Sequence, residues 1–110
     1  MNKIEELEES VERIERSRRH EVVSIDNSVS TTLLFTASSS TVDIEVDVAS
    51  TALPHIELVV NGESKVYDAS FVSEKVVTKK TNTLRVNIGA GGLISKRIRI
   101  EGIGVKLLSV

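Results

Sequence analysis

The sequence contains no cysteine and no tryptophan, only one proline, and aromatic residues at 3% of its positions. The missing cysteines exclude disulfide bonds, thiolate catalysis and cysteine-based zinc sites. The shortage of aromatic side chains leaves no broad stacking platform. What is there instead is a hydrophobic fraction of 40%, rich in Val, Ile and Leu, in a chain of 110 residues. This size and composition predict one folded domain with a β-branched core.

Strong charge of either sign is also lacking, since 14 Lys and Arg face 16 Asp and Glu, for a net charge of -2. A general nucleic-acid-binding protein carries a basic excess, so we expect no nucleic-acid partner. No apolar run reaches the length of about 18 residues that crosses a membrane. The first residues are acidic where a secretory leader is basic and then apolar. We therefore expect a soluble chain with no leader and no membrane partner.

Residues 1–21 differ in composition from the rest, with seven acidic and five basic residues and no Gly or Pro. Glu and Arg are good helix formers, and the aliphatic residues recur at spacings of three, four and three: Ile4, Leu7, Val11 and Ile14. This spacing predicts a helix with the narrow apolar seam of a coiled coil. We expect the seam to join copies of the chain into a homo-oligomer, a trimer rather than a dimer because Ile occurs at both seam positions. Docking of the helix on its own domain is the alternative.

In residues 22–110 the apolar pattern changes to a period of two. It is clearest where Val42, Ile44, Val46 and Val48 alternate with acidic residues, which is the pattern of a half-buried strand. Further strands are expected over residues 22–25, 31–36, 56–60, 65–67, 71–77, 84–88, 98–100 and 105–110. About eight short strands after one helix predict an antiparallel β-sandwich or jelly roll. The lack of crossover helices excludes a parallel α/β fold.

Three short segments predict turns or loops. Asn61-Gly62, between two apolar strands, predicts a two-residue hairpin turn with positive φ at both residues. Asp26-Asn27-Ser28 predicts a turn between the first two strands. Residues 89–92, Gly-Ala-Gly-Gly, are expected to form a hairpin loop and not a phosphate-binding loop, because a strand and not a helix follows them.

The acidic residues Asp43, Glu45 and Asp47 share one face of their strand, about 7 Å apart, which is too wide for one small ion. We expect them to face Arg97, Arg99 and Glu101 of another strand as cross-strand pairs. His20, near the predicted helix end, and His55 are the only histidines, too few for a metal cage. No Gly-x-Ser-x-Gly nucleophile motif occurs. The sequence therefore favours a protein that is not an enzyme and holds no metal or cofactor.

The candidates for ligand contact are Tyr67, a few residues after the Asn-Gly turn, and His55, at a strand start. Packing of Tyr67 in the core is the alternative. The candidates for nucleic-acid contact are the basic residues at the helix end and the pairs Lys79-Lys80 and Lys96-Arg97. Glu partners at i,i+4 account for several of the helical ones.

A helix with an Ile/Leu/Val seam, joined directly to a Ser/Thr/Val-rich β-sandwich, resembles small virion modules of tailed phages, namely fibre, baseplate and head-decoration proteins that assemble as trimers. The resemblance covers the whole chain in layout and includes no specific motif. It implies a non-enzymatic structural or attachment module of a virion, with other virion proteins as partners. The segment IELVVNGESKVYD (56–68) also resembles a strand-NG-strand hairpin of jelly-roll modules, carbohydrate-binding ones among them. The alternative function is a ligand-binding β-sandwich, cytoplasmic or elsewhere, that recognises a glycan or another protein.

Overall fold

The structure, a computed structural model, describes residues 19–89 and 92–109, and every regular element in that part of the chain is a β-strand. The strands are β1 (Arg19–Asp26), β2 (Ser30–Thr36), β3 (Thr41–Ser50), β4 (His55–Val60), β5 (Glu63–Asp68), β6 (Phe71–Val77), β7 (Asn82–Gly89), β8 (Leu93–Ile103) and β9 (Lys106–Ser109). Residues 1–18 of the predicted helix lie outside the described residues.

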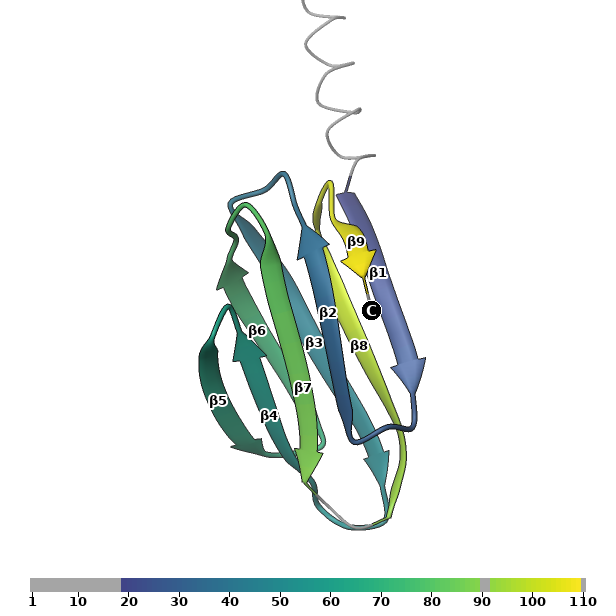
Figure 1. Ribbon diagram of the computed structural model, residues 1–110. Coiled ribbons are helices and arrows are strands. Elements are labelled where there is room, and N and C mark those ends of the chain that lie inside the picture. The colour runs from purple at the N-terminus through teal and green to yellow at the C-terminus, as the bar shows by residue number, and fades with distance from the viewer. Residues whose placement is uncertain (1–18, 90–91, 110) are drawn as a thin grey trace, which may run out of the picture.

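The nine strands form two antiparallel sheets that face each other (Figure 1). Sheet A has the order β1-β8-β3-β6, and sheet B has the order β5-β4-β7-β2-β9. The pairs β4·β5, β3·β6, β2·β7 and β1·β8 nest within one another, which is the connectivity of a jelly roll with β9 added at one edge. The prediction of a mainly β, antiparallel two-sheet fold is thus confirmed.

The core lies between the sheets and follows from the alternation in the sequence. Every second residue of β3, from Val42 to Val48, is buried, and the acidic residues between them face outward. The fifteen buried apolar side chains form one cluster: Leu33, Phe35, Val42, Ile44, Val46, Val48, Ile56, Leu58, Val72, Leu84, Val86, Ile88, Ile98, Ile100 and Val105. Because each such burial contributes roughly 1.5 to 3 kcal/mol, this cluster fixes which face of each strand points inward.

The hairpin turn between β4 and β5 has the predicted geometry. Asn61 has a φ of 51° and Gly62 a φ of 86°, as a type I′ turn requires. A Cβ added at Gly62 would meet no atom within 4 Å, so the positive φ alone accounts for the glycine. Asn61 also binds the neighbouring strand, since its Oδ1 accepts a hydrogen bond from the Thr83 backbone N at 3.0 Å.

Two strand boundaries and one connection differ from the sequence prediction. β1 begins at Arg19, so the last residues expected in the helix, Arg19 to Glu21, belong to a strand. The physical reason is their pairing with β8 and the ion pairs that Arg19 and Glu21 make across sheet A, which outweigh the pairing expected along a helix. The connection over 89–92 is not a hairpin loop, because β7 and β8 belong to different sheets. The strand expected over 98–100 extends over Leu93–Ile103.

Candidate functional site

The outer face of sheet A carries the acidic row that the sequence singled out. Asp43 lies opposite Glu101, Glu45 opposite Arg99 and Asp47 opposite Arg97, so the predicted cross-strand arrangement is confirmed. The Arg99 guanidinium donates hydrogen bonds to Glu45 Oε2 at 2.6 Å and to the carboxylates of Glu21 and Glu101. The bonds to Glu45 and Glu21 raise the pKa of Arg99 above its usual range.

The same face continues toward both edges of sheet A through further ion pairs. Arg19 lies 2.6 Å from Glu101 Oε1 and 3.3 Å from Asp43 Oδ2, and Lys75 lies 3.3 Å from Asp43 Oδ1. The hydrogen bond from Arg19 lowers the pKa of Glu101 despite partial desolvation. These carboxylates therefore have cations as neighbours. In the part of the chain that the structure describes, no three His, Asp or Glu side chains converge as metal ligands.

A shallow hollow of about 320 Å³ interrupts this face. Its lining is Glu21, Glu45, Asp47, Phe71, Arg97 and Arg99. Because Glu21 and Glu45 both accept hydrogen bonds from Arg99, the hollow is an ionic surface in which these three side chains are paired with each other.

Lys96 occupies the opposite, inner face of β8. Its side chain is fully buried, and Nζ donates to Asp26 Oδ1 at 2.5 Å, to Ser28 Oγ at 3.0 Å and to the Ser28 carbonyl oxygen. Lys96 was one candidate for nucleic-acid contact, and its burial removes it from that set, because a partner in solvent cannot reach it. Its role is to hold the β1–β2 turn against β8.

Asp26 is the acceptor at the centre of this turn. Its Oδ1 accepts from the Ser28 backbone N at 3.0 Å, and its Oδ2 accepts from Thr31 Oγ1 at 2.9 Å. Burial raises the pKa of Asp26, but the hydrogen bonds from Lys96, Ser28 and Thr31 outweigh burial and lower the pKa to about 2. The sequence indicated the turn, but it gave no sign that a lysine 70 residues away would complete it.

Tyr67 and His55 were the predicted ligand contacts, and the structure does not bring them together. Tyr67 points inward from β5, packs against the core and donates a hydrogen bond to Glu74 of β6. That bond and burial raise the pKa of Tyr67 to about 12. His55 is exposed, with Nδ1 in contact with Asp68 Oδ1. Since the pairs His55·Asp68 and Ile56·Tyr67 are consecutive in the register, the two side chains lie on opposite faces of sheet B.

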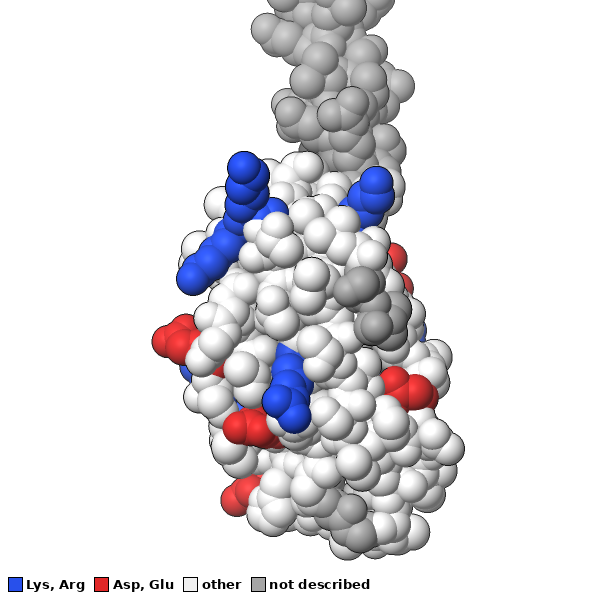
Figure 2. Space-filling model, in the orientation of Figure 1, with Lys and Arg blue, Asp and Glu red and all other residues white. Residues whose placement is uncertain are grey.

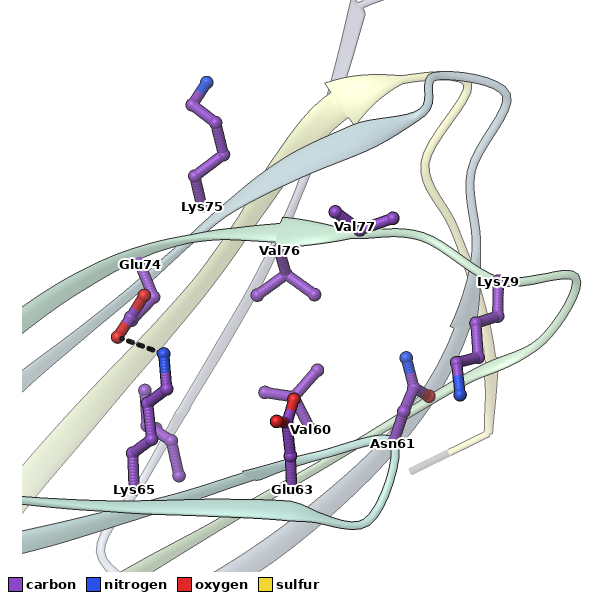
Figure 3. A pocket seen from close by; sticks show the side chains of 10 residues that line it. Val60, Asn61, Glu63, Lys65, Glu74, Lys75, Val76, Val77 and Lys79 are labelled. Carbon is purple, nitrogen blue, oxygen red and sulfur yellow. Dashed lines mark hydrogen bonds and ion pairs between the residues drawn. The ribbon is translucent and has the colours of Figure 1, made fainter.

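A cleft of about 430 Å³ opens where the edge strands β5 and β6 of the two sheets face each other (Figure 3). Leu58, Val60 and Val76 supply its apolar lining, and Lys65, Glu63 and Lys79 are among its charged residues. Glu74 closes one end, because it accepts hydrogen bonds from both Tyr67 and Lys65 of the other sheet. Sequence patterns missed this cleft, since it depends on which strands form the sheet edges.

The outer face of sheet B has a different character, with few charged side chains on the side that Figure 2 shows. A polar row crosses it from β2 to β5: Ser30 Oγ donates to Asn87 Oδ1 at 2.7 Å, Asn87 Nδ2 to Glu57 Oε1 at 2.8 Å, and Ser64 Oγ to Glu57 Oε2 at 2.6 Å. The bonds from Ser64 and Asn87 lower the pKa of Glu57. The row ties four strands together.

The predicted seam residues Ile4, Leu7, Val11 and Ile14 lie outside the described residues, so the oligomerisation site stays a prediction. Within the described residues, no helix has the length and apolar character needed to cross a membrane.

Comparison with known proteins adds no family. No protein-family model matches the chain, and no curated protein matches its sequence. Among solved structures it is similar to dimeric latent PorU from Porphyromonas gingivalis, at 10% identity and a TM-score of 0.26. The match covers 78% of this chain and 10% of that chain, so the chain spans about a tenth of PorU. A similarity at this level carries no argument about function.

Proposed function

We propose that this protein is a non-enzymatic structural or attachment module of a larger assembly, a virion component that self-associates as a homotrimer through its N-terminal helix. The observation that carries the proposal is that the two ends of the sandwich differ. β1 begins at one end, so residues 1–18 join the domain there (Figure 1). The connections β1–β2, β3–β4 and β7–β8 lie at the other end.

Exposed apolar side chains at the far end support the proposed attachment role. Three apolar side chains from three different segments are largely exposed there: Val29, Leu53 and Ile94. Backbone hydrogen bonds link these segments to each other and to sheet B, from Thr51 N to Gly92 O at 3.1 Å and from Ile88 N to Val29 O at 2.7 Å. Exposed apolar side chains that gather into one patch mark a protein contact, and we assign that role to these three. A module joined at one end, with these apolar side chains exposed at the other, suits attachment.

The test is the molar mass of the full chain in solution, measured by light scattering over a range of micromolar concentrations. We expect three copies of the 12.0 kDa chain. Leu7→Ser with Val11→Ser should dissociate the oligomer, because each buried aliphatic side chain contributes roughly 1.5 to 3 kcal/mol. Glu5→Ser with Glu12→Ser, which change residues outside the seam, should leave the mass unchanged. A monomeric parent, or an unchanged mass after the seam substitutions, contradicts the proposal.

A second candidate is a ligand-binding module that recognises a glycan, and the cleft between β5 and β6 favours it. Its volume of about 430 Å³ falls in the range of small-molecule sites. The test is titration of the ¹⁵N-labelled chain with a panel of mono- and oligosaccharides, followed by NMR. Shifts confined to Leu58, Val60 and Val76, and lost in Val60→Arg, support this function. Shifts that are absent or spread over both sheets contradict it.

A further inference from the structure

β1 and β6 are the two outer strands of sheet A, so among the described strands each has a neighbour in that sheet on one side alone. We propose that these edges pair with each other between copies of the chain, so that β6 of one copy continues sheet A into β1 of the next. The inference rests on the proposed self-association and names the surface and register that it uses.

The backbone of β6 offers its free hydrogen-bonding groups at odd-numbered residues. At the two ends of the β3·β6 ladder, Thr78 N donates to Ser40 O at 2.9 Å and Val48 N donates to Ser70 O at 2.7 Å. Successive residues of an antiparallel strand bond to alternate sides, so the even-numbered residues of β6 bond β3. The N–H and C=O groups of Phe71, Ser73, Lys75 and Val77 consequently point to the free edge.

The same alternation, carried across β3 and β8, identifies the free groups of β1. Odd-numbered residues of β3 bond β8, as in the pair Glu45·Arg99, and even-numbered residues of β8 bond β1, as in the pair Ile100·Val22. The free groups of β1 therefore belong to Arg19, Glu21, Val23 and Ile25. On both edges, these residues also direct their side chains to the outer face of sheet A.

The two edges match each other row by row. The register places Ile25, Arg97, Asp47 and Phe71 in one row across sheet A, and Glu21, Glu101, Asp43 and Lys75 in another. A neighbouring copy docked side by side at the same level thus sets Phe71 opposite its Ile25 and Lys75 opposite its Glu21. Ile25 is 67% exposed and Phe71 52% exposed in the single chain, and this contact covers both.

Charge selects this register over its neighbours. In the level register, Lys75 meets a glutamate, an opposite-charge pair of the kind that stabilises adjacent strands. A shift by two residues sets Lys75 opposite Arg19 in one direction and Val23 in the other, and it also separates Phe71 from Ile25. The favoured register is therefore the one that brings both complementary pairs together.

The direction of the chains agrees with the proposed helical seam. β1 and β6 run in opposite directions within sheet A, so copies standing side by side with the same orientation make an antiparallel contact. Residues 1–18 of every copy then join at the same end, as a parallel bundle needs. A contact between unlike edges closes into a ring when the rotation permits, and three seam helices set that rotation.

The main competitor is a two-fold contact of β6 with itself. In the register centred on Glu74, Phe71 faces Val77 and Ser73 faces Lys75, so no opposite charges meet. The two chains also point in opposite directions, which sends residues 1–18 to opposite ends.

The absence of cysteine from the chain makes cross-linking a direct test. In the full chain, Ile25→Cys with Phe71→Cys places thiols on residues that face each other between copies, at a Cα separation of about 5.5 Å that a disulfide can bridge. Mild oxidation should give covalent trimers on a non-reducing gel. Ile25→Cys with Val77→Cys, whose residues lie three rows apart, should give none.

The outcomes separate this inference from the proposed function. Two results would overturn the edge contact and leave helical self-association standing. One is covalent dimers from the variant Phe71→Cys with Val77→Cys. The other is an intact oligomer in which Ile25→Cys with Phe71→Cys forms no cross-link. A parent chain that is monomeric at all concentrations would remove both.

A charge reversal provides an independent reading of the register. Lys75→Glu should raise the protein concentration at which half of the oligomer dissociates. The expected change is about fivefold per contact, which corresponds to the free energy of one cross-strand pair. Adding Glu21→Lys should recover most of that loss, because the opposite charges are restored with their positions exchanged. A double variant that dissociates further than either single variant would show that these side chains do not meet.

Discussion

Lys96 and Arg99 lie three residues apart on β8, on opposite faces of sheet A, and both bind carboxylates. The Lys96 side chain is 0% exposed and the Arg99 side chain 34% exposed. If Arg99 loses a carboxylate, water can replace it, whereas the ammonium of Lys96 has no such substitute. The comparison teaches that the energetic role of an ion pair in this protein depends on which side of the strand it occupies.

Removing the acceptor of the buried pair should have the largest effect. Asp26→Ala leaves the Lys96 ammonium buried with only the two oxygens of Ser28, and loss of one partner from a buried pair costs about 3 to 5 kcal/mol. We expect about 3 kcal/mol, at the lower end of that range, because these Ser28 contacts remain. Urea unfolding followed by circular dichroism measures the loss.

The matched control replaces the cation as well. Lys96→Met in the Asp26→Ala background fills the same volume without a charge, so it should recover most of the lost free energy of unfolding. If Asp26→Ala unfolds within about 0.5 kcal/mol of the parent, then Lys96 reaches water in solution and its burial is not decisive.

Acid should weaken the buried pair next. The pKa of Asp26 is about 2 in the folded chain against 3.8 for an ordinary aspartate, so its contribution is complete above about pH 4 and is lost as the pH falls toward 2. After a discount for partial exposure of Asp26, the loss should be about 1 to 2 kcal/mol. Urea unfolding at pH 6, 4 and 2.5 measures it.

Asp26→Asn provides the reference for this titration. The other carboxylates with lowered pKa, those of Glu74 and Glu101 among them, still titrate in this variant. Its stability should therefore fall less steeply than that of the parent below pH 4. Parallel curves would mean that Asp26 has an ordinary pKa.

The exposed network should respond least. Glu45→Gln removes one of three carboxylates around Arg99 and leaves a neutral acceptor in its place, so the melting temperature should fall by no more than about 3 °C. The difference from the parent should shrink further in 0.5 M NaCl, because salt screens exposed charges. A larger, salt-independent drop would place Arg99 in the same class as Lys96.

The outer face of sheet A was predictable because the residue pattern that defines it lies within single strands. Acidic residues alternate with Val42, Ile44 and Val46, and this fixes which side of the strand is wet. Arg97 and Arg99 alternate with Ile98 and Ile100 in the same way, so opposite charges on two wet faces suggested the pairing. The Asn61-Gly62 turn was predictable for a similar reason, since two adjacent residues define its geometry.

The buried pair and the cleft were not predictable from local patterns. Lys96 continues the inward positions of Ile98 and Ile100, but a lysine at that position normally indicates that the strand has left the core. Only the pairing of β1 with β8 brings Asp26 opposite it. The cleft likewise depends on β5 and β6 being sheet edges, a property of the whole topology. Arg19 to Glu21 were misassigned because their strand partners lie some 80 residues away.

The nested strand pairs have a consequence for the order of folding. The β4·β5 hairpin closes over two residues, and β3·β6, β2·β7 and β1·β8 each close a longer loop around it. Closing a longer loop costs more chain entropy, and chains dominated by distant contacts fold slowly. Of these strands, β1 leaves the ribosome before the others, and it is thus expected to be the last to pair. Until β8 has been synthesised, β1 has no partner in sheet A, and it must be protected from pairing with the wrong strand.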